Sequence, residues 1–233
     1  MDTHQGDLTV ERGKNRELIV RHTSIDKIDS VLVWLHGLGD SAEGFLPVFY
    51  SEDSPVPAET KVRLLTAPLA PVTLNNRMIM NSWYDIKLLD SNDSKRSYSH
   101  DDVDINSKAI QQIIDEEAKR FGGDYKKVFI GGFSQGCAMA LHNGCHYGDR
   151  LGGIIGLSGY LLGHTKIPEN MPPTLLTHGA DDDVVPIDLA LKSYENIRKS
   201  PSVKFNQISY LGHGLNDEVF KLVKQFMAKC LKK

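Results

Sequence analysis

The segment Gly132-Phe133-Ser134-Gln135-Gly136 constrains the fold of this chain more than any other. It follows the apolar run Val128-Phe129-Ile130 and precedes Cys137-Ala138-Met139-Ala140-Leu141, which predicts a strand, a tight turn and a helix. Side chains at the two flanking glycines would collide with the neighbouring strand and helix. The turn holds the serine hydroxyl above a sheet edge, near the positive end of the helix. Gly-x-Ser-x-Gly in this context is typical of a nucleophile, although a capping serine in an ordinary turn has the same short pattern.

Two partners follow the serine in the order serine, acid, histidine. The expected strand 173–178 runs into the acidic loop Asp181-Asp182-Asp183, and His213 follows the expected strand 203–210. A histidine with its usual pKa of about 6.5 can take the proton of a serine hydroxyl, and a carboxylate can fix its ring tautomer. An acidic surface loop or a loop histidine would be unremarkable alone. Their positions after successive strands predict a catalytic triad of Ser134, one acid of this loop and His213.

A reaction at Ser134 also needs two backbone N–H groups to bind the oxyanion. One is expected from Gln135, the residue after the serine. The other is expected from Leu38, in the loop after the strand 31–35. His36 lies in the same loop but precedes the serine, so we interpret it as a structural residue.

The same loop can be read as a dinucleotide site, because Gly37-x-Gly39-x-x-Ala42 follows a strand. That site requires an acidic residue about 20 positions further on, at the end of the next strand. The next strand, 61–66, ends in Ala67-Pro68 with no carboxylate. The sequence therefore disfavours a dinucleotide.

Composition limits the remaining function classes. A length of 233 residues with 40% hydrophobic and 24% charged residues fits one soluble α/β domain, and a net charge of −3 disfavours nucleic-acid binding. No run approaches the roughly 18 apolar residues of a membrane span. The three cysteines are odd in number and lack metal-type spacing, and the N-terminus is polar. We expect a cytoplasmic protein.

Strand and helix patterns alternate along the chain. A first antiparallel edge strand is expected at 17–23. Further strands are expected at 31–35, 61–66, 128–133, 153–158, 174–178 and 203–210, and helices near 43–50, 102–121, 135–147, 188–199 and 215–231. This alternation predicts a mostly parallel central sheet with helices on both faces.

The stretch from Pro68 to about Asp102 lacks clear periodicity, and long irregular loops are often functional. We expect residues 72–89 to form a cap over the active site, because they include leucine, methionine and tryptophan that would otherwise be exposed. Residues 90–100 are polar and charged, and we expect them to form a mobile surface loop.

Two clusters resemble metal ligands. His142 and His146 have the i, i+4 spacing of a helical zinc pair, but the intervening residues lack the glutamate of a metalloprotease. His100-Asp101-Asp102 with Asp104 is explained by the preference for acids at a helix N-terminus. We therefore expect neither a metal nor a cofactor.

Four motifs together resemble the acyl-protein thioesterase and lysophospholipase family, also called the phospholipase/carboxylesterase family. The resemblance covers roughly residues 30–230. The motifs are Leu35-His36-Gly37-Leu38-Gly39-Asp40; Pro71-Val72-Thr73-Leu74-Asn75 with Ser82-Trp83-Tyr84-Asp85-Ile86; Gly131-Gly132-Phe133-Ser134-Gln135-Gly136; and His178-Gly179 followed by Asp182 and Val185-Pro186.

The resemblance implies a compact α/β-hydrolase fold without a large lid domain and with a shallow apolar tunnel for an acyl chain. Residues 1–28 are expected to be an N-terminal extension with an edge strand, of unknown role, and residues 29–233 a single domain. The family pattern selects Asp182 as the triad acid. The wall of the acyl site is expected to include Leu74, Trp83, Val184 and Met78.

The predicted function is that of a serine hydrolase, foremost an S-palmitoyl (acyl-protein) thioesterase. A carboxylesterase or lysophospholipase acting on small esters or lysolipids is the alternative, and a binding module that has lost catalysis is disfavoured by the complete triad. The expected partners are acylated proteins, small acyl esters or lysophospholipids, with transient contact to a membrane surface. Nucleic acid and a transmembrane segment are not expected, and we expect a monomer or weak homodimer. Departures from the family pattern, such as Gly214-Leu215 after His213, leave the substrate open.

Overall fold

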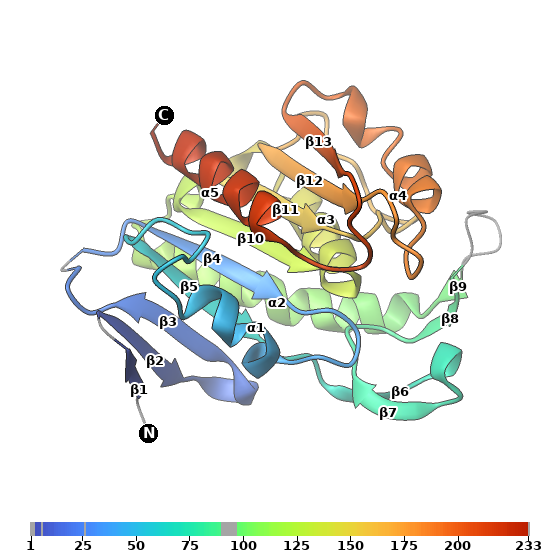
Figure 1. The fold of residues 1–233 in the computed structure, drawn as a ribbon, viewed down its shortest axis with the longest axis horizontal. Helices are drawn as coiled ribbons and strands as arrows, with labels where there is room; N and C mark the ends of the chain where they lie inside the picture. The colour runs from blue at the N-terminus through green and yellow to red at the C-terminus, as the bar shows by residue number, and fades with distance from the viewer. Residues whose placement is uncertain (1–2, 6, 26, 90–96, 233) are drawn as a thin grey trace.

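A mostly parallel sheet forms the centre of the molecule. The computed structural model describes residues 3–5, 7–25, 27–89 and 97–232. Within these residues the sheet has nine strands (Figure 1). From one edge to the other they are β1 (Thr3–Gln5), β2 (Leu8–Arg12), β3 (Leu18–His22), β5 (Thr60–Leu65), β4 (Ser30–Leu35), β10 (Val128–Phe133), β11 (Gly153–Leu157), β12 (Thr174–Gly179) and β13 (Val203–Ile208).

The six strands from β5 to β13 run parallel to one another, as predicted. Every residue of β4, β5, β11 and β12 is buried. Buried strands of this kind read as nearly continuous apolar runs, because helices cover both faces of a parallel sheet. Strand β5 is an exception, since its Lys61 and Arg63 are paired with Glu117.

The N-terminal part of the sheet differs from the expectation. Strand β3 is antiparallel to β5, but it is not an edge strand, because β2 and β1 continue the sheet beyond it. Leu8 and Val10 of β2 are buried against the same core as β3. In β2, apolar and polar residues alternate only over Leu8, Thr9 and Val10 before the charged Glu11 and Arg12, which is too little pattern to predict a strand.

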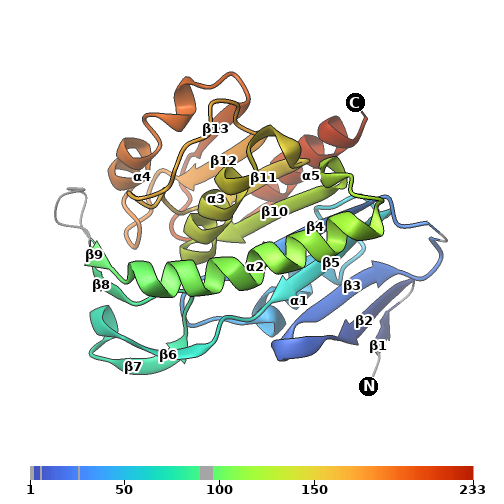
Figure 2. The same cartoon turned by 180° about the vertical axis from the view of Figure 1, so that it is seen from behind.

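Helices lie on both faces of the sheet, as expected. They are α1 (Ala42–Phe49), α2 (His100–Arg120), α3 (Gln135–Tyr147), α4 (Ile187–Ser193) and α5 (Asp217–Leu231). Helices α2, α3 and α4 contribute to one hydrophobic cluster, and α1 and α5 contribute to the other. Figure 1 shows α1 and α5 in front of the sheet, and Figure 2 shows α2 and α3 from behind. Helix α4 ends earlier than expected, and a separate 3₁₀ turn follows at Ile197–Lys199.

The strand order of the sheet reverses at β4. Strand β5 follows β4 in sequence and lies on one side of it, whereas β10 lies on the other side. Ligands of open parallel sheets bind at such a switch point, beyond the carboxyl ends of the strands. The loop after β4 and the turn after β10, which contain the sequence-predicted Leu38 and Ser134, meet there.

Two small hairpins extend from the same end of the molecule (Figure 1). One pairs β6 (Leu69–Val72) with β7 (Met78–Asn81), and the other pairs β8 (Ile86–Leu88) with β9 (Ser97–Tyr98). The expected cap of residues 72–89 rested on burial of its apolar side chains. That expectation is wrong for the first hairpin, because Met78 and Ile79 are 64% and 69% exposed. Residues 90–96 of the expected surface loop lie outside the described residues. No helix in the described ranges has the length and apolar character needed to cross a bilayer.

Candidate active site

Ser134 occupies a strained turn between β10 and α3. Its φ of 55° lies in the left-handed region, which non-glycine residues adopt mainly where the surrounding structure enforces it. A Cβ at Gly132 would collide with the carbonyl of Gly136, and a Cβ at Gly136 would collide with the carbonyl of Leu35. The Ser134 amide donates to Leu157 O at 2.9 Å. The two glycines therefore permit the close approach that places the serine at the carboxyl end of β10.

The structure brings Ser134, His213 and Asp182 together. Nε2 of His213 lies 3.0 Å from Oγ of Ser134, and Nδ1 of His213 lies 2.8 Å from Oδ2 of Asp182. The His213 ring packs on Phe133 with centroids 4.8 Å apart. With the Nδ1 proton donated to Asp182, Nε2 is free to accept the proton of the serine hydroxyl.

The Asp182 carboxylate is buried among hydrogen-bond donors. Its Oδ1 accepts from the amides of Val184 and Val185 at 3.0 and 2.8 Å, and His178 Nε2 lies 3.3 Å from its Oδ2. Burial raises the pKa of Asp182, but hydrogen bonds from His178, His213 and the Val185 amide outweigh burial and hold this pKa well below its usual value. Asp182 is therefore ionised at neutral pH.

The backbone of the loop after β4 lies against Ser134. A Cβ at Gly37 would lie 3.4 Å from Cβ of the serine. Within the described part of the chain, the N–H groups of Leu38 and Gln135 have no hydrogen-bond acceptor. These two amides are therefore available to an oxyanion formed at the serine.

His36 fixes the shape of this loop, as its interpretation as a structural residue required. Its Nδ1 donates to Gly37 O at 2.6 Å, and its Nε2 accepts from the Ala67 amide at 3.0 Å. Burial lowers the pKa of His36, so the ring is neutral at neutral pH. A neutral ring satisfies both hydrogen bonds at once.

Trp83 lies behind the loop rather than on the surface. It is 3% exposed, and its indole N–H donates to His36 O at 2.9 Å. Its backbone amide donates to Oε1 of Gln135 at 2.9 Å, and Nε2 of Gln135 donates to Tyr84 O at 2.8 Å. The Gln135 side chain thus joins the elbow to residues 82–84. Sequence reasoning assigned neither of these contacts.

The other residues expected at the acyl site are exposed. Leu74 and Met78 belong to the β6–β7 hairpin and are 43% and 64% exposed, and Val184 is 54% exposed in the loop that holds Asp182. The hairpin reaches the loop after β4 through the Gly39 amide, which donates to Asn81 O at 2.9 Å. The role of these side chains in binding an acyl chain stays a prediction.

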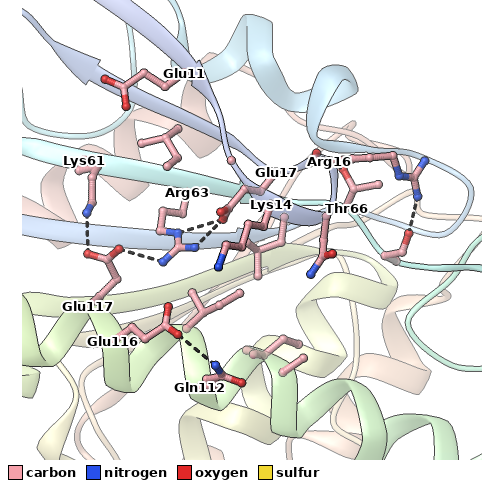
Figure 3. Close-up of a pocket in the computed structure, with 18 of the residues that line it drawn as sticks. Glu11, Lys14, Arg16, Glu17, Lys61, Arg63, Thr66, Gln112, Glu116 and Glu117 are labelled. Atoms are coloured by element: carbon pink, nitrogen blue, oxygen red, sulfur yellow. Dashed lines mark hydrogen bonds and ion pairs between the residues drawn. The ribbon is translucent and has the colours of Figure 1, made fainter.

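A cavity of about 1160 Å³ lies on another part of the molecule, between β3, β5 and α2. Figure 3 shows that its charged side chains point toward one another. Glu117 accepts from Lys61 at 2.6 Å and from Arg63 at 2.9 Å, and Arg63 also donates to Glu17 at 2.6 Å. None of Ser134, Asp182 and His213 lines it. We interpret this network as structural, because its charges are neutralised within the fold.

His178 is the site residue that sequence reasoning missed. The segment His178-Gly179 was recognised only as part of a family motif, without a role for the side chain. The ring is buried at the end of β12, and its Nε2 donates to Val185 O at 2.8 Å. Its spacing of four residues from Asp182 was the available signal.

Comparison with known sequences establishes the family. Residues 17–231 match the phospholipase/carboxylesterase family. The chain belongs to this family. Acyl-protein thioesterase 1 of Emericella nidulans is 30% identical over 223 residues, which cover 89% of this chain and 93% of that protein. Acyl-protein thioesterase 1 homolog 1 of Dictyostelium discoideum is 34% identical over 211 residues, covering 88% and 92%.

Solved structures with similar folds include two plant proteins. Arabidopsis thaliana SOBER1 has a TM-score of 0.76 and 29% identity, with 87% of this chain and 99% of that chain covered. Zea mays acyl-protein thioesterase 2 has a TM-score of 0.75 and 26% identity, covering 93% and 99%. The predicted α/β-hydrolase fold is confirmed, and the described residues form no large lid domain.

Proposed function

We propose that this member of the phospholipase/carboxylesterase family hydrolyses acyl thioesters, with Ser134 as the nucleophile. The observation that carries the proposal is the position of His213, which lies within hydrogen-bond distance of both Ser134 and Asp182. Hydrogen-bonding distances of this kind are the geometric signature of an activated serine. The strained turn at Ser134 and the two available amides further support the assignment.

The proposed reaction has two steps. Ser134 Oγ attacks the acyl carbonyl while His213 Nε2 takes its proton, and the amides of Leu38 and Gln135 bind the oxyanion. The tetrahedral intermediate collapses to an acyl-serine as His213 protonates the leaving thiolate. Water, deprotonated by His213, then attacks the acyl-serine, and the fatty acid leaves as the proton returns to Ser134. Asp182 stabilises the imidazolium in both steps.

Acylated proteins are the proposed substrates. The relatives named above carry the name acyl-protein thioesterase at 30% and 34% identity over most of both chains. The exposed apolar side chains of the β6–β7 hairpin, next to the loop after β4, suit an acyl chain or a membrane surface from which it is withdrawn. Absence of disulfides among the described cysteines is consistent with the proposed cytoplasmic location.

A chain-length series tests this proposal. Matched thioesters and oxoesters from acetyl to palmitoyl are compared by kcat/KM for the wild type and Ser134→Ala. We expect a maximum at long-chain thioesters and its loss in Ser134→Ala by several orders of magnitude. A maximum at two to four carbons without thioester preference would instead assign a small-ester carboxylesterase. A Ser134→Ala variant with near-normal turnover would remove Ser134 from the mechanism.

A further inference from the structure

Three side chains from distant parts of the chain form a cluster away from Ser134. One carboxylate oxygen of Asp104 in α2, one ring nitrogen of His142 in α3 and one ring nitrogen of His164 in the segment after β11 lie within 4.8 Å of one another. We propose that this cluster binds a zinc ion. The proposal rests on these three side chains and their neighbours, and is independent of the proposed hydrolase activity.

The remaining contacts of the two histidines leave the same nitrogen available in each ring. Nδ1 of His142 lies 3.0 Å from Oγ1 of Thr165, and Nδ1 of His164 lies 2.8 Å from the hydroxyl of Tyr98. In metal sites, a hydrogen bond at one ring nitrogen sets the tautomer and the orientation of a ligating histidine. Both rings therefore present Nε2 as the metal-ligating atom.

Nε2 of His164 supplies an independent reason for a ligand. This atom is buried, and it has no hydrogen-bond partner in the described part of the chain. A buried polar atom without a partner is costly, because it has lost its hydrogen bond to water. The His100 ring stacks on His164 with centroids 4.3 Å apart and fixes the plane of the ring. A zinc ion bound to Nε2 would remove this cost.

The donor types select the metal. Two imidazoles and one carboxylate suit zinc, whereas magnesium and calcium prefer oxygen ligands alone. Zinc lies about 2.0–2.2 Å from such ligands, so tetrahedral ligands lie about 3.4 Å apart. The side chain of Asp104 is exposed and can rotate inward to close the remaining distance.

Binding would connect three parts of the fold. The ligands come from α2, α3 and the segment that follows β11. Through Tyr98, the cluster also contacts β9, whose partner β8 follows the buried Trp83 and Tyr84. With three protein ligands, the fourth zinc position is left to water. We infer a site that stabilises the packing of these segments.

Calorimetric titration of the chelator-treated full chain with zinc tests the proposal. We expect one site per chain with a Kd of about 1 µM or tighter, and no comparable site for magnesium. Gln substitution of either histidine (His142→Gln or His164→Gln) should weaken binding at least about 100-fold, since loss of an outer hydrogen bond alone costs about 10–100-fold. Thr165→Val should fall within that smaller range. His146→Gln is the matched control on the same helix and should bind as the wild type does.

Two further measurements make the test decisive. Thermal midpoints in chelator establish that each variant is folded. Zinc should raise the midpoint of the wild type and of His146→Gln, raise that of Thr165→Val less, and leave those of His142→Gln and His164→Gln unchanged. In the unmodified chain, zinc should protect His142, but not His146, from diethyl pyrocarbonate, as read by peptide mass spectrometry. Absence of a tight site in the wild type overturns the proposal. So does a tight site that survives either histidine substitution and is lost in His213→Gln, which would place the zinc at Ser134.

Discussion

Nε2 of His178 lies 3.3 Å from Oδ2 of Asp182, the same oxygen that accepts a hydrogen bond from Nδ1 of His213. The carboxylate is thus held by one histidine from β12 and is presented to a second histidine next to Ser134. Its other oxygen accepts two backbone amides. Three hydrogen-bond donors and the adjacent His178 ring surround this buried carboxylate and fix its rotamer and its charge, and the first two predictions depend on this arrangement.

Asp182→Asn should lower kcat by about 10⁴-fold with little change in KM. An amide can donate to Nδ1 of His213 and so favour the tautomer that carries its proton on Nε2, which cannot accept the serine proton. Steady-state kinetics with a soluble thioester measures the effect. Asp183→Asn, in the same loop and exposed, is the matched control and should retain wild-type kcat. Equal losses in the two variants would contradict the assignment of the acid.

Asp182 should also make stability depend on pH. Its folded-state pKa lies well below the ordinary value of 3.8, so the folded state binds this proton less readily than the unfolded state does. The contribution to stability is therefore fully present above about pH 5 and is lost as the pH falls below 4. Urea unfolding at pH 7, 5, 4 and 3 should show the wild type more stable than Asp182→Asn by roughly 1–3 kcal/mol at pH 7. The difference should be smaller at pH 3 than at pH 5, because the loss begins near the unfolded pKa and continues down to the folded-state pKa; a constant difference would refute this explanation.

Trp83→Phe should lower kcat about tenfold while KM stays near the wild-type value. The substitution removes the N–H that donates to His36 O and loosens the loop that contains Leu38. Because an oxyanion donor acts mainly in the transition state, the loss should appear in kcat. Single-turnover acylation of Ser134 by a thioester measures this step directly. An unchanged acylation rate would mean that the hydrogen bond is not needed to hold the loop.

Ile79→Asp should reduce turnover of acylated substrates bound to lipid vesicles more than turnover of a soluble short-chain ester. Ile79 is 69% exposed on the β6–β7 hairpin, beside the loop after β4. Ile105→Asp is the matched control, because Ile105 is 63% exposed on α2. Vesicle co-sedimentation should show weaker binding for Ile79→Asp alone. Equal binding by both variants and the wild type would exclude a membrane contact through this hairpin.

Glu117→Ala should destabilise the fold by about 3–5 kcal/mol, because Lys61 and Arg63 would keep buried charges without their shared partner. The thermal midpoint should fall by roughly 10 °C for a domain of this size. Glu116→Ala removes an exposed glutamate from the same helix and should change the midpoint by no more than about 2 °C. Similar midpoints for the two variants would mean that the network contributes little.

Most of the parallel sheet could be predicted from the sequence, because strands such as β4, β10 and β12 are buried, largely apolar runs followed by helical patterns. The positions of Ser134, Asp182 and His213 at strand ends were predicted for the same reason. The hairpins β6–β7 and β8–β9 could not be predicted, because their strands are two to four residues long and partly exposed. Short exposed strands lack the apolar alternation on which such predictions depend.

The two histidine and acid clusters illustrate what the sequence left open. Helical spacing grouped His142 with His146, and chain proximity grouped Asp104 with His100. The structure instead brings Asp104 and His142 together with His164, a residue that no local pattern had selected.

The sequence by itself determined the alternation of strands and helices, the tight turn at Ser134 and the order of its partners, because these depend on local periodicity and on glycine. Only the tertiary structure decided that His178 lies beside Asp182, that Trp83 holds the loop after β4, and that ligand atoms of Asp104, His142 and His164 lie within 4.8 Å of one another. Contacts between residues far apart in the chain depend on how helices pack on the sheet. That packing brings together side chains which no spacing within one helix or strand can relate.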